Sequence, residues 1–200
     1  MNRPYDVVED FERDLAEYCG APYAVTTTSC TMALLLMLKY FDPNVPINIP
    51  KYTYIGVLQS IMNAGLSPTF RDENWQEEGS YLLSPLPIRD SARLLTSGMY
   101  KPGEYTCLSF HWAKHLPIGQ GGAVLLDDMH CVEWLLRARM DGRTPGVAPK
   151  DDTFLHGGMH AYMIPEQAAR GRMLLSLLPK HNRPIPEDNY VNLEEVRFEL

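Results

Sequence analysis

The sequence predicts an α/β protein, a three-layer sandwich in which helices cover both faces of a mostly parallel, mixed β-sheet. Two observations carry this prediction. Short apolar runs of strand length alternate with longer runs of helical periodicity along most of the 200 residues. Polar residues follow several of the strand-like runs, which is typical of sheets that bind ligands at the carboxyl ends of their strands. The length is sufficient for one domain with a substantial core.

The expected helices are marked by apolar periodicity and by residues that begin or end helices. Val8, Phe11 and Leu15 recur at helical spacing, and Gly20 is placed to end that helix. Thr53 is a plausible N-cap for a later helix. The further helices are expected at 30–40, 54–64, 131–140 and 165–177.

The expected strands are short apolar runs bounded by turn residues. They lie at 23–26, 46–49, 68–71, 86–89, 105–110 and 123–126. An acidic, irregular loop is expected at 72–79. After residue 178 the chain becomes proline-rich, which is typical of a linker or a wrapping arm.

Composition and charge narrow the range of functions. The formal charge of −7 argues against general nucleic-acid binding, which needs clustered lysine and arginine. The four cysteines show no CxxC spacing, so we expect free thiols in a reducing cytoplasm. The longest apolar run, 32–38, is too short to span a bilayer. The acidic, amphipathic N-terminus does not have the pattern of a signal peptide.

Lys114 lies in the most informative segment of the chain. A predicted strand ends at Ser109, Lys114 follows five positions later, and a glycine-rich reversal leads into the strand expected at 123–126. A lysine between two strands is partly shielded from water, which favours the neutral, nucleophilic amine. Such an amine is suited to forming a Schiff base with a carbonyl cofactor, and a surface lysine in a turn is the alternative.

A phosphate site is expected where a helix begins directly after a strand. Ser29, Cys30 and Thr31 open that helix. The free N–H groups of a first turn, the helix dipole and the Thr31 hydroxyl all favour a phosphate. Ser109 is placed to bind the phosphate from the opposite side. The alternative is that Ser29 is only an N-cap.

A carboxylate and an aromatic ring are expected on the same edge of the sheet. Asp90 ends an apolar strand, and a carboxylate against a pyridine ring would keep the ring nitrogen protonated. Tyr54 is placed to cover the face of such a ring, and the alternative is that its side chain only packs against neighbouring residues. For Asp90 the alternative is a cap or a salt bridge with Arg89 or Arg93.

Five ordered motifs occur between roughly residues 8 and 178. They are Ser-Cys-Thr-Met-Ala-Leu at 29–34, Pro-Lys-Tyr-Thr-Tyr at 50–54 with Gly-Leu-Ser-Pro-Thr-Phe-Arg-Asp at 65–72, Asp-Ser-Ala at 90–92, the segment 109–122, and Gly-Met-His-Ala-Tyr-Met at 158–163 with Gln-Ala-Ala at 167–169. Together they resemble the DegT/DnrJ/StrS-type sugar aminotransferases, pyridoxal-phosphate enzymes of the aspartate-aminotransferase-like fold (fold type I). The chain departs from that pattern at Cys30, Gln120 and Tyr162, where the family has glycine, glutamate and arginine.

The resemblance implies two catalytic residues. Lys114 would form the Schiff base with pyridoxal 5'-phosphate and then move a proton between substrate and cofactor. Asp90 would pair with the pyridine nitrogen, and Tyr54 would stack on the ring. The first-turn amides at 30–31 and the Ser109 hydroxyl would hold the phosphate.

Two further residues are implied to contact the cofactor. Arg93 stands where the family has glutamine or histidine and is a candidate contact to the cofactor or to a donor carboxylate. His160 stands where the family has an asparagine that reaches the phosphate of the neighbouring subunit, which implies a homodimer with shared active sites. The complete set of cofactor-binding candidates is Cys30, Thr31, Tyr54, Asp90, Arg93, Ser109, Lys114 and His160.

The implied function is amino transfer in two halves. An amino acid donor, glutamate or glutamine, gives its amino group to the cofactor, and a keto acceptor, in this family usually a nucleotide-linked keto sugar, takes it. Residues 1–178 would form a minimal cofactor-binding large domain and residues 179–200 a proline-rich C-terminal arm, with the family's small C-terminal domain nearly absent.

Three alternatives accompany this prediction. The chain could be a cofactor-binding or regulatory remnant without transaminase activity. Relatives that dehydrate sugars carry histidine at the Schiff-base position, which Lys114 disfavours. A metal site is disfavoured because His111/His115 lie beside a proline, without a carboxylate partner, and two glycines make a helix at His156/His160 improbable, so no metal is expected.

Overall fold

The computed structural model of the chain describes residues 5–186 and 189–198. The predicted helices are all present, with small changes at their ends. Between them lie seven strands in the described residues, one more than predicted. The helices are α1 (Asp6–Cys19), α2 (Cys30–Phe41), α3 (Ile55–Asn63), α4 (Met129–Ala138) and α5 (Pro165–Leu175), with short 3-10 turns η1 (Pro149–Asp151) and η2 (Leu193–Glu195); the strands are β1 (Tyr23–Thr27), β2 (Ile47–Pro50), β3 (Pro68–Arg71), β4 (Tyr81–Leu82), β5 (Ile88–Asp90), β6 (Tyr105–Ser109) and β7 (Gly122–Leu126).

The main sheet is mixed, as predicted, with the strand order β1-β7-β6-β5-β4. The prediction that it is mostly parallel was wrong, because only β5 and β6 pair in parallel in this sheet. The physical reason lies in the connections. A short turn at 83–87 joins β4 to β5, and the reversal at 110–121 turns the chain back between β6 and β7, so both pairs are antiparallel, whereas parallel neighbours need a crossover. A second, parallel pair forms between β2 and β3.

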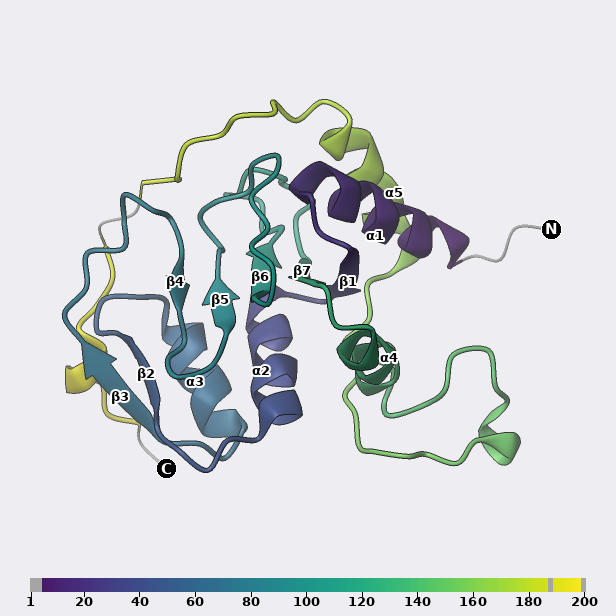
Figure 1. Cartoon of the computed structure of the whole chain (residues 1–200), viewed down its shortest axis with the longest axis horizontal. Helices are drawn as coiled ribbons and strands as arrows, with labels where there is room; N and C mark the ends of the chain where they lie inside the picture. Colours follow the sequence, from purple (N-terminus) through teal and green to yellow (C-terminus); the bar gives the residue numbers. More distant parts are fainter. Residues whose placement is uncertain (1–4, 187–188, 199–200) are drawn as a thin grey trace.

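Helices cover both faces of the main sheet, so the structure has three layers (Figure 1). Along β7 successive side chains point to opposite faces. Val124 and Leu126 belong to the core shared with α2, α3 and α4. Ala123 and Leu125 belong to the second core, under α1 and α5. Both faces of β7 are therefore buried, and all five of its residues are buried.

The boundaries of two helices follow directly from local chemistry. Gly20 ends α1 in the left-handed conformation (φ 73°), where glycine has no steric cost, and its N–H closes the last turn. α3 differs from the prediction, because its N-cap is Tyr54 and no side chain caps it. Thr53 is buried instead, and its hydroxyl bonds to the Tyr81 hydroxyl.

The C-terminal arm runs back over the molecule from α5 toward β2 and β3 (Figure 1). The Ile185 N–H donates to the Arg93 carbonyl, and the Leu193 N–H donates to the Lys51 carbonyl, each at 2.9 Å. Leu193 is 2% exposed and belongs to the core around α2. Of the predicted arm, 187, 188, 199 and 200 lie outside the described residues. The division of the chain at residue 178 stays a prediction.

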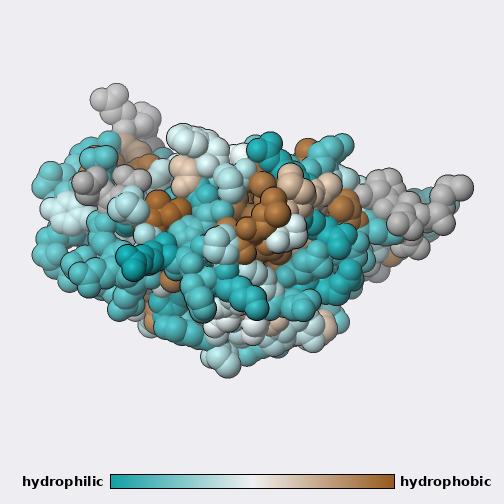
Figure 2. All heavy atoms as spheres, turned by 90° about the horizontal axis from the view of Figure 1, so that it is seen from above, coloured by the Kyte–Doolittle hydropathy of each residue, from teal (hydrophilic) through white to brown (hydrophobic). Residues whose placement is uncertain are grey.

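Hydrophobic side chains also reach the surface. Figure 2 shows several of them gathered on the face seen from above. Among the described residues, Met173 of α5 and Leu177, just after the end of that helix, are exposed. None of the described helices is both long enough and apolar enough to cross a membrane.

Candidate active site

A cavity of about 340 Å³ lies at the edge of the main sheet where β5 and β6 end and α2 begins. Six of the eight predicted cofactor-binding residues line it, together with side chains that the sequence did not single out. β5 and β6 are parallel neighbours, so Asp90 and Ser109, which lies two residues beyond Cys107, the partner of Asp90, both reach this edge. The predicted residues in its wall are Cys30, Thr31, Tyr54, Asp90, Ser109 and Lys114.

The N-terminus of α2 forms one end of the cavity. The Ser29 hydroxyl accepts the Met32 N–H at 3.1 Å, so Ser29 is the N-cap of this helix. The Cys30 and Thr31 amides belong to the first turn, where a helix offers no carbonyl of its own, and such amides attract anions. Gly122 permits this placement, because a Cβ there would lie 2.4 Å from the Cys30 nitrogen.

Asp90 is the buried carboxylate of the cavity. It is 5% exposed and accepts hydrogen bonds from the Ala92 N–H at 2.9 Å and from the Tyr81 hydroxyl at 2.9 Å. The predicted alternative of a salt bridge is not observed, because Arg89 pairs with Glu104 instead and no ion pair of the described residues includes Asp90. A buried carboxylate without a permanent cation is costly, which is typical of a functional site.

Burial raises the pKa of the Asp90 carboxyl, and its partners only partly offset this effect. The Ala92 N–H, the Tyr81 hydroxyl and the Lys114 ammonium all lower the pKa. Burial and the neighbouring Asp90 charge raise the pKa of the Cys30 thiol well above its usual value. Cys30 therefore stays protonated, and its Sγ–H faces Asp90 Oδ1 at 3.9 Å.

Lys114 is half-buried in the turn between β6 and β7, opposite the start of α2. Its N–H donates to the His111 carbonyl at 2.9 Å, which folds the turn back toward the sheet. His111 and Gln120 line the cavity beside it. The primary amine and the buried carboxylate thus share one cavity, as the sequence predicted.

Tyr54 stands at the edge of the cavity with 57% of its surface exposed. Gly56 leaves room for its ring, because a Cβ at that position would lie 2.5 Å from the ring and 3.0 Å from Thr31 Oγ1. The ring therefore lies near the start of α2, over the same end of the cavity.

The structure places the other two predicted residues outside the cavity wall. Arg93 is 2% exposed, lies over the Trp75 ring at 4.9 Å, and donates to the Gln76 side chain and to the Ile185 carbonyl. It therefore supports the wall from behind and ties the arm to the acidic loop. His160 is exposed, and its Nδ1 lies 3.0 Å from Asp141 Oδ2.

Three residues of the site escaped the sequence analysis. Trp75 and Tyr190 line the cavity and stack on each other, with ring centroids 5.9 Å apart. Trp75 is the only aromatic residue of its acidic segment, which was a usable signal. Tyr190 lies in the arm, and nothing local in the sequence indicates that the arm returns to the sheet. Tyr81 lies behind the cavity wall and bonds to Asp90.

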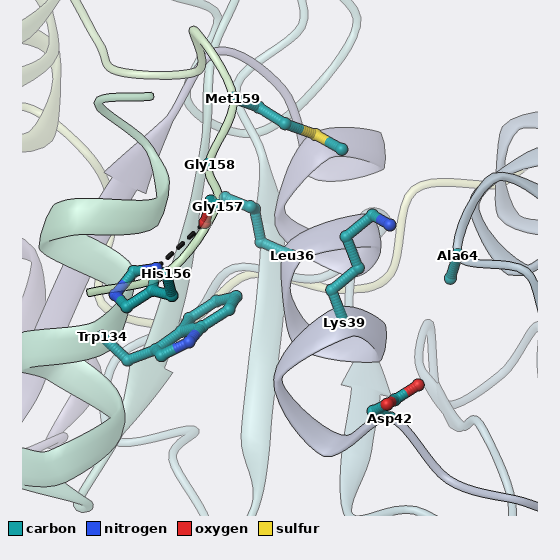
Figure 3. A pocket seen from close by; sticks show the side chains of 9 residues that line it. All are labelled: Leu36, Lys39, Asp42, Ala64, Trp134, His156, Gly157, Gly158 and Met159. Carbon is teal, nitrogen blue, oxygen red and sulfur yellow. Dashed lines mark hydrogen bonds between the residues drawn. The ribbon is translucent and has the colours of Figure 1, made fainter. Parts of the chain in front are cut away.

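A second cavity, of about 450 Å³, lies on the outer side of α2 (Figure 3). Lys39 and Asp42 extend along one side of it, and Trp134 stacks on His156 on the other. The His156 Nδ1 contacts the neighbouring Gly157 carbonyl at 2.9 Å. None of the predicted site residues lines this cavity. Within the described ranges, no group of three or more His, Cys, Asp or Glu side chains is placed to hold a metal ion.

The fold and this cavity define a class of protein: an α/β protein with a primary amine, a buried carboxylate and a helix N-terminus at one edge of a mixed sheet. The sequence model of the DegT/DnrJ/EryC1/StrS aminotransferase family matches residues 1–90. The resemblance to this family is therefore confirmed for that part of the chain.

Two curated relatives agree with this family. The chain is 31% identical over 85 residues to dTDP-3-amino-3,6-dideoxy-alpha-D-galactopyranose transaminase of Aneurinibacillus thermoaerophilus, a match of 42% of this chain and 23% of the relative. It is 28% identical over 139 residues to the spore coat polysaccharide biosynthesis protein SpsC of Bacillus subtilis (strain 168), a match of 68% of this chain and 35% of the relative.

A solved structure supports the fold over more of the chain. AtS13 from Actinomadura melliaura superimposes with a TM-score of 0.77 at 20% identity, over 85% of this chain and 59% of AtS13. The α/β architecture thus matches fold type I aminotransferases over roughly half their length. The chain spans less than two thirds of the length of the proteins that it matches.

The residues present fit pyridoxal phosphate, the cofactor of this family. A buried carboxylate suits the ring nitrogen, a primary amine suits the aldehyde, and first-turn amides with a hydroxyl suit the phosphate. Asp90, Lys114 and Ser109 supply these groups around one cavity, and 340 Å³ is within the range of small-molecule sites. Gly122 lets the backbone of Ser29 and Cys30 pack directly against β7, which holds the start of α2 at this edge of the sheet.

Proposed function

We propose that this protein is a pyridoxal-phosphate-dependent aminotransferase. It would move the amino group of an amino acid donor, glutamate or glutamine, to a keto acceptor. The observation that carries the proposal is that Lys114 and Asp90 line the same cavity as the N-terminus of α2. The names of the relatives, a sugar transaminase and a polysaccharide biosynthesis protein, support a nucleotide-linked keto sugar as the acceptor.

Each residue of the cavity has a definite task in this proposal. The bound cofactor supplies an electron-withdrawing ring that stabilises charge on the reacting carbon. The Asp90 carboxylate would keep the ring nitrogen protonated. The first-turn amides of α2 and the Ser109 hydroxyl would hold the phosphate and so orient the ring.

Lys114 carries the proton transfers. Its Nζ is the amine that would hold the cofactor aldehyde in the resting protein. The same amine would take a proton from the donor α-carbon as a general base and return one as a general acid. Trp75 and Tyr190 shield one side of the cavity, and shielding from water strengthens the interaction of Asp90 with a protonated ring.

A titration with pyridoxal phosphate tests this proposal. The purified protein should develop an absorption band in the near-violet that is lost in Lys114→Ala and retained in Lys101→Ala, an exposed lysine outside the cavity. Addition of glutamate or glutamine should then convert the bound cofactor to its amine form. Lys114→Ala protein that still converts the cofactor with a donor would refute the catalytic assignment.

A second candidate function is a cofactor-binding or regulatory protein without transaminase activity. One observation favours it: two residues that the resemblance assigns to the cofactor, Arg93 and His160, lie outside the cavity wall. This reading predicts the same absorption band but no conversion to the amine form with any amino acid donor. The donor step therefore separates the two candidates.

The homodimer belongs to the proposal as well. His160 is exposed, where a partner subunit has access to it, and so are Met173 of α5 and Leu177 just after that helix. Sedimentation equilibrium at micromolar concentration should give the mass of two chains, 2 × 22.7 kDa. A mass of one chain, unchanged by pyridoxal phosphate, would contradict the shared active site.

A further inference from the structure

The register of the sheet brings Tyr81 to Asp90. β4 and β5 are antiparallel neighbours, and Tyr81 is the direct cross-strand partner of Asp90. Side chains of directly opposed residues lie on the same face, with Cβ atoms about 5 Å apart. β4 has only two residues, and one of them is thereby placed beside Asp90.

The phenol of Tyr81 links two other side chains. Its hydroxyl donates to Asp90 Oδ2 at 2.9 Å and lies 2.7 Å from Thr53 Oγ1. A phenol has one proton to donate. When Asp90 is ionised, Tyr81 donates to it and Thr53 must donate to Tyr81. Thr53, Tyr81 and Asp90 are 2%, 2% and 5% exposed, so water does not compete for these bonds.

We propose that Tyr81 is a positioning residue for the proposed reaction: it fixes the Asp90 carboxylate in the cavity and stabilises its ionised form, with Thr53 orienting the phenol. The inference rests on the proposed function for the meaning of Asp90, but the hydrogen-bond chain exists without any cofactor. Tyr81 acts through Asp90 and does not line the cavity itself.

The chemistry around Asp90 shows why such a residue is needed. The groups that face the carboxyl are Cys30 from α2, Cys107 from β6, Tyr81 from β4 and Lys114 from the turn before β7. Both thiols stay protonated because burial raises their pKa. Burial also raises the pKa of the Asp90 carboxyl, and the Tyr81 bond acts against that effect. The Asp90 carboxyl must be ionised if it is to stabilise a protonated ring nitrogen of the cofactor.

A purely structural role is the competing explanation. The Tyr81 ring packs edge-on against Trp75, with centroids 4.8 Å apart, and a phenylalanine would fill the same space. Packing therefore accounts for the ring but not for the hydroxyl. Tyr81→Phe removes the hydroxyl alone, so it separates the two roles.

The decisive experiment measures the titration of Asp90 in cofactor-free protein. We expect the carbon-13 carboxyl signal of Asp90, assigned by its loss in Asp90→Asn, to titrate at a higher pH in Tyr81→Phe than in the wild type. Thr53→Val should shift it in the same direction by less, because it removes only the donor to the phenol. The affinity for pyridoxal phosphate at neutral pH should fall about tenfold in Tyr81→Phe.

Tyr105→Phe is the matched control. Tyr105 is another tyrosine of the sheet whose hydroxyl donates to a carboxylate, Asp128 Oδ2, at 3.0 Å. It lies outside the cavity wall, so its loss should leave the Asp90 titration and the cofactor affinity unchanged. Thermal unfolding of both variants shows that the comparison is made on folded protein, and Thr53→Val supplies the test if Tyr81→Phe does not fold.

Two outcomes separate this inference from the proposed function. An Asp90 titration that is the same in the wild type, Tyr81→Phe and Thr53→Val would overturn the inference, whatever the protein does with pyridoxal phosphate. A wild-type protein that binds no pyridoxal phosphate, yet shows the shifted titration in Tyr81→Phe, would refute the proposed function and leave the hydrogen-bond chain established.

Discussion

Asp90 and Asp128 make an instructive comparison, because they have similar hydrogen-bond partners and opposite behaviour. Asp128 accepts phenol hydrogen bonds from Tyr105 at 3.0 Å and Tyr40 at 3.2 Å, and backbone N–H groups at the start of α4. Asp90 accepts a phenol and a backbone N–H as well. Both carboxylates therefore have the partners that favour the ionised form.

The two carboxyl groups nevertheless shift in opposite directions. At Asp128, burial raises the pKa, but the Cys131 N–H and the Tyr105 phenol outweigh it and the net pKa is lowered. At Asp90, burial is deeper and wins, so the net pKa is raised. Asp128 is a helix cap that stabilises the fold. Burial of the Asp90 carboxyl destabilises the folded state, which is expected of a residue that is present for function.

The largest expected difference between the two carboxylates is in amino transfer. Asp90→Asn should slow the conversion of bound cofactor by glutamate roughly 10²–10³-fold, because the ring nitrogen loses its anionic partner. Asp128→Asn has the same change of chemistry and should stay within about twofold of the wild type. Stopped-flow absorbance of the single half-reaction measures both rates. Equal rates in the two variants would contradict the assignment of Asp90.

A smaller difference is expected in the dependence of stability on pH. Asp90 has a raised folded pKa, so the folded state binds the extra proton between the unfolded and folded values, and stability falls as pH rises through that window. Asp90→Asn removes this loss, and the cofactor-free variant should be at least as stable as the wild type at pH 7. Urea unfolding measures this.

Asp128 should show the opposite sign. Its folded pKa is lowered, so its contribution is present above the unfolded pKa and is lost as pH falls through the folded value. Asp128→Asn should therefore be less stable than the wild type at pH 7, and the gap should narrow in acid. Variants of Asp90 and Asp128 that lose stability equally at pH 7 would remove the distinction between a functional and a structural carboxylate.

The smallest expected difference concerns the two thiols near these carboxylates. Cys30 faces Asp90 at 3.9 Å, a weak sulfur bond, so Cys30→Ala should change the affinity for pyridoxal phosphate by about twofold or less. Cys131 is fully buried beside Asp128, and Cys131→Ala should leave that affinity unchanged while costing on the order of 1 kcal/mol of stability. Isothermal titration and urea unfolding report the two effects separately. A larger change in affinity for Cys131→Ala than for Cys30→Ala would contradict the site.

The sequence was sufficient to predict the cavity edge of the sheet. Asp90 and Ser109 each end an apolar run, and parallel neighbours bring such ends together. Ser29 and Gly20 were predicted correctly as helix boundaries, because capping is local chemistry. Residues whose position depends on their own strand or helix were thus accessible from sequence patterns.

The features that escaped prediction depend on distant parts of the chain. β4 has two residues, too few for any periodicity, so Tyr81 was not seen as the partner of Asp90. Thr53 has the composition of an N-cap, but its hydroxyl bonds to Tyr81 from 28 positions away. Arg93 follows the Asp90 motif closely, yet its side chain turns to the arm and to Trp75. Tertiary packing decided each of these positions.

The central claim is that Lys114 and Asp90 hold one pyridoxal phosphate between them. Reduction of the cofactor-loaded protein with borohydride, followed by peptide mass mapping, tests it most directly. The account predicts the reduced cofactor's mass on the peptide that contains Lys114, at one equivalent per chain, and its absence there in Lys114→Ala. A result in which the label is spread over exposed lysines such as Lys39 and Lys101, while Lys114 is unmodified, would contradict this claim.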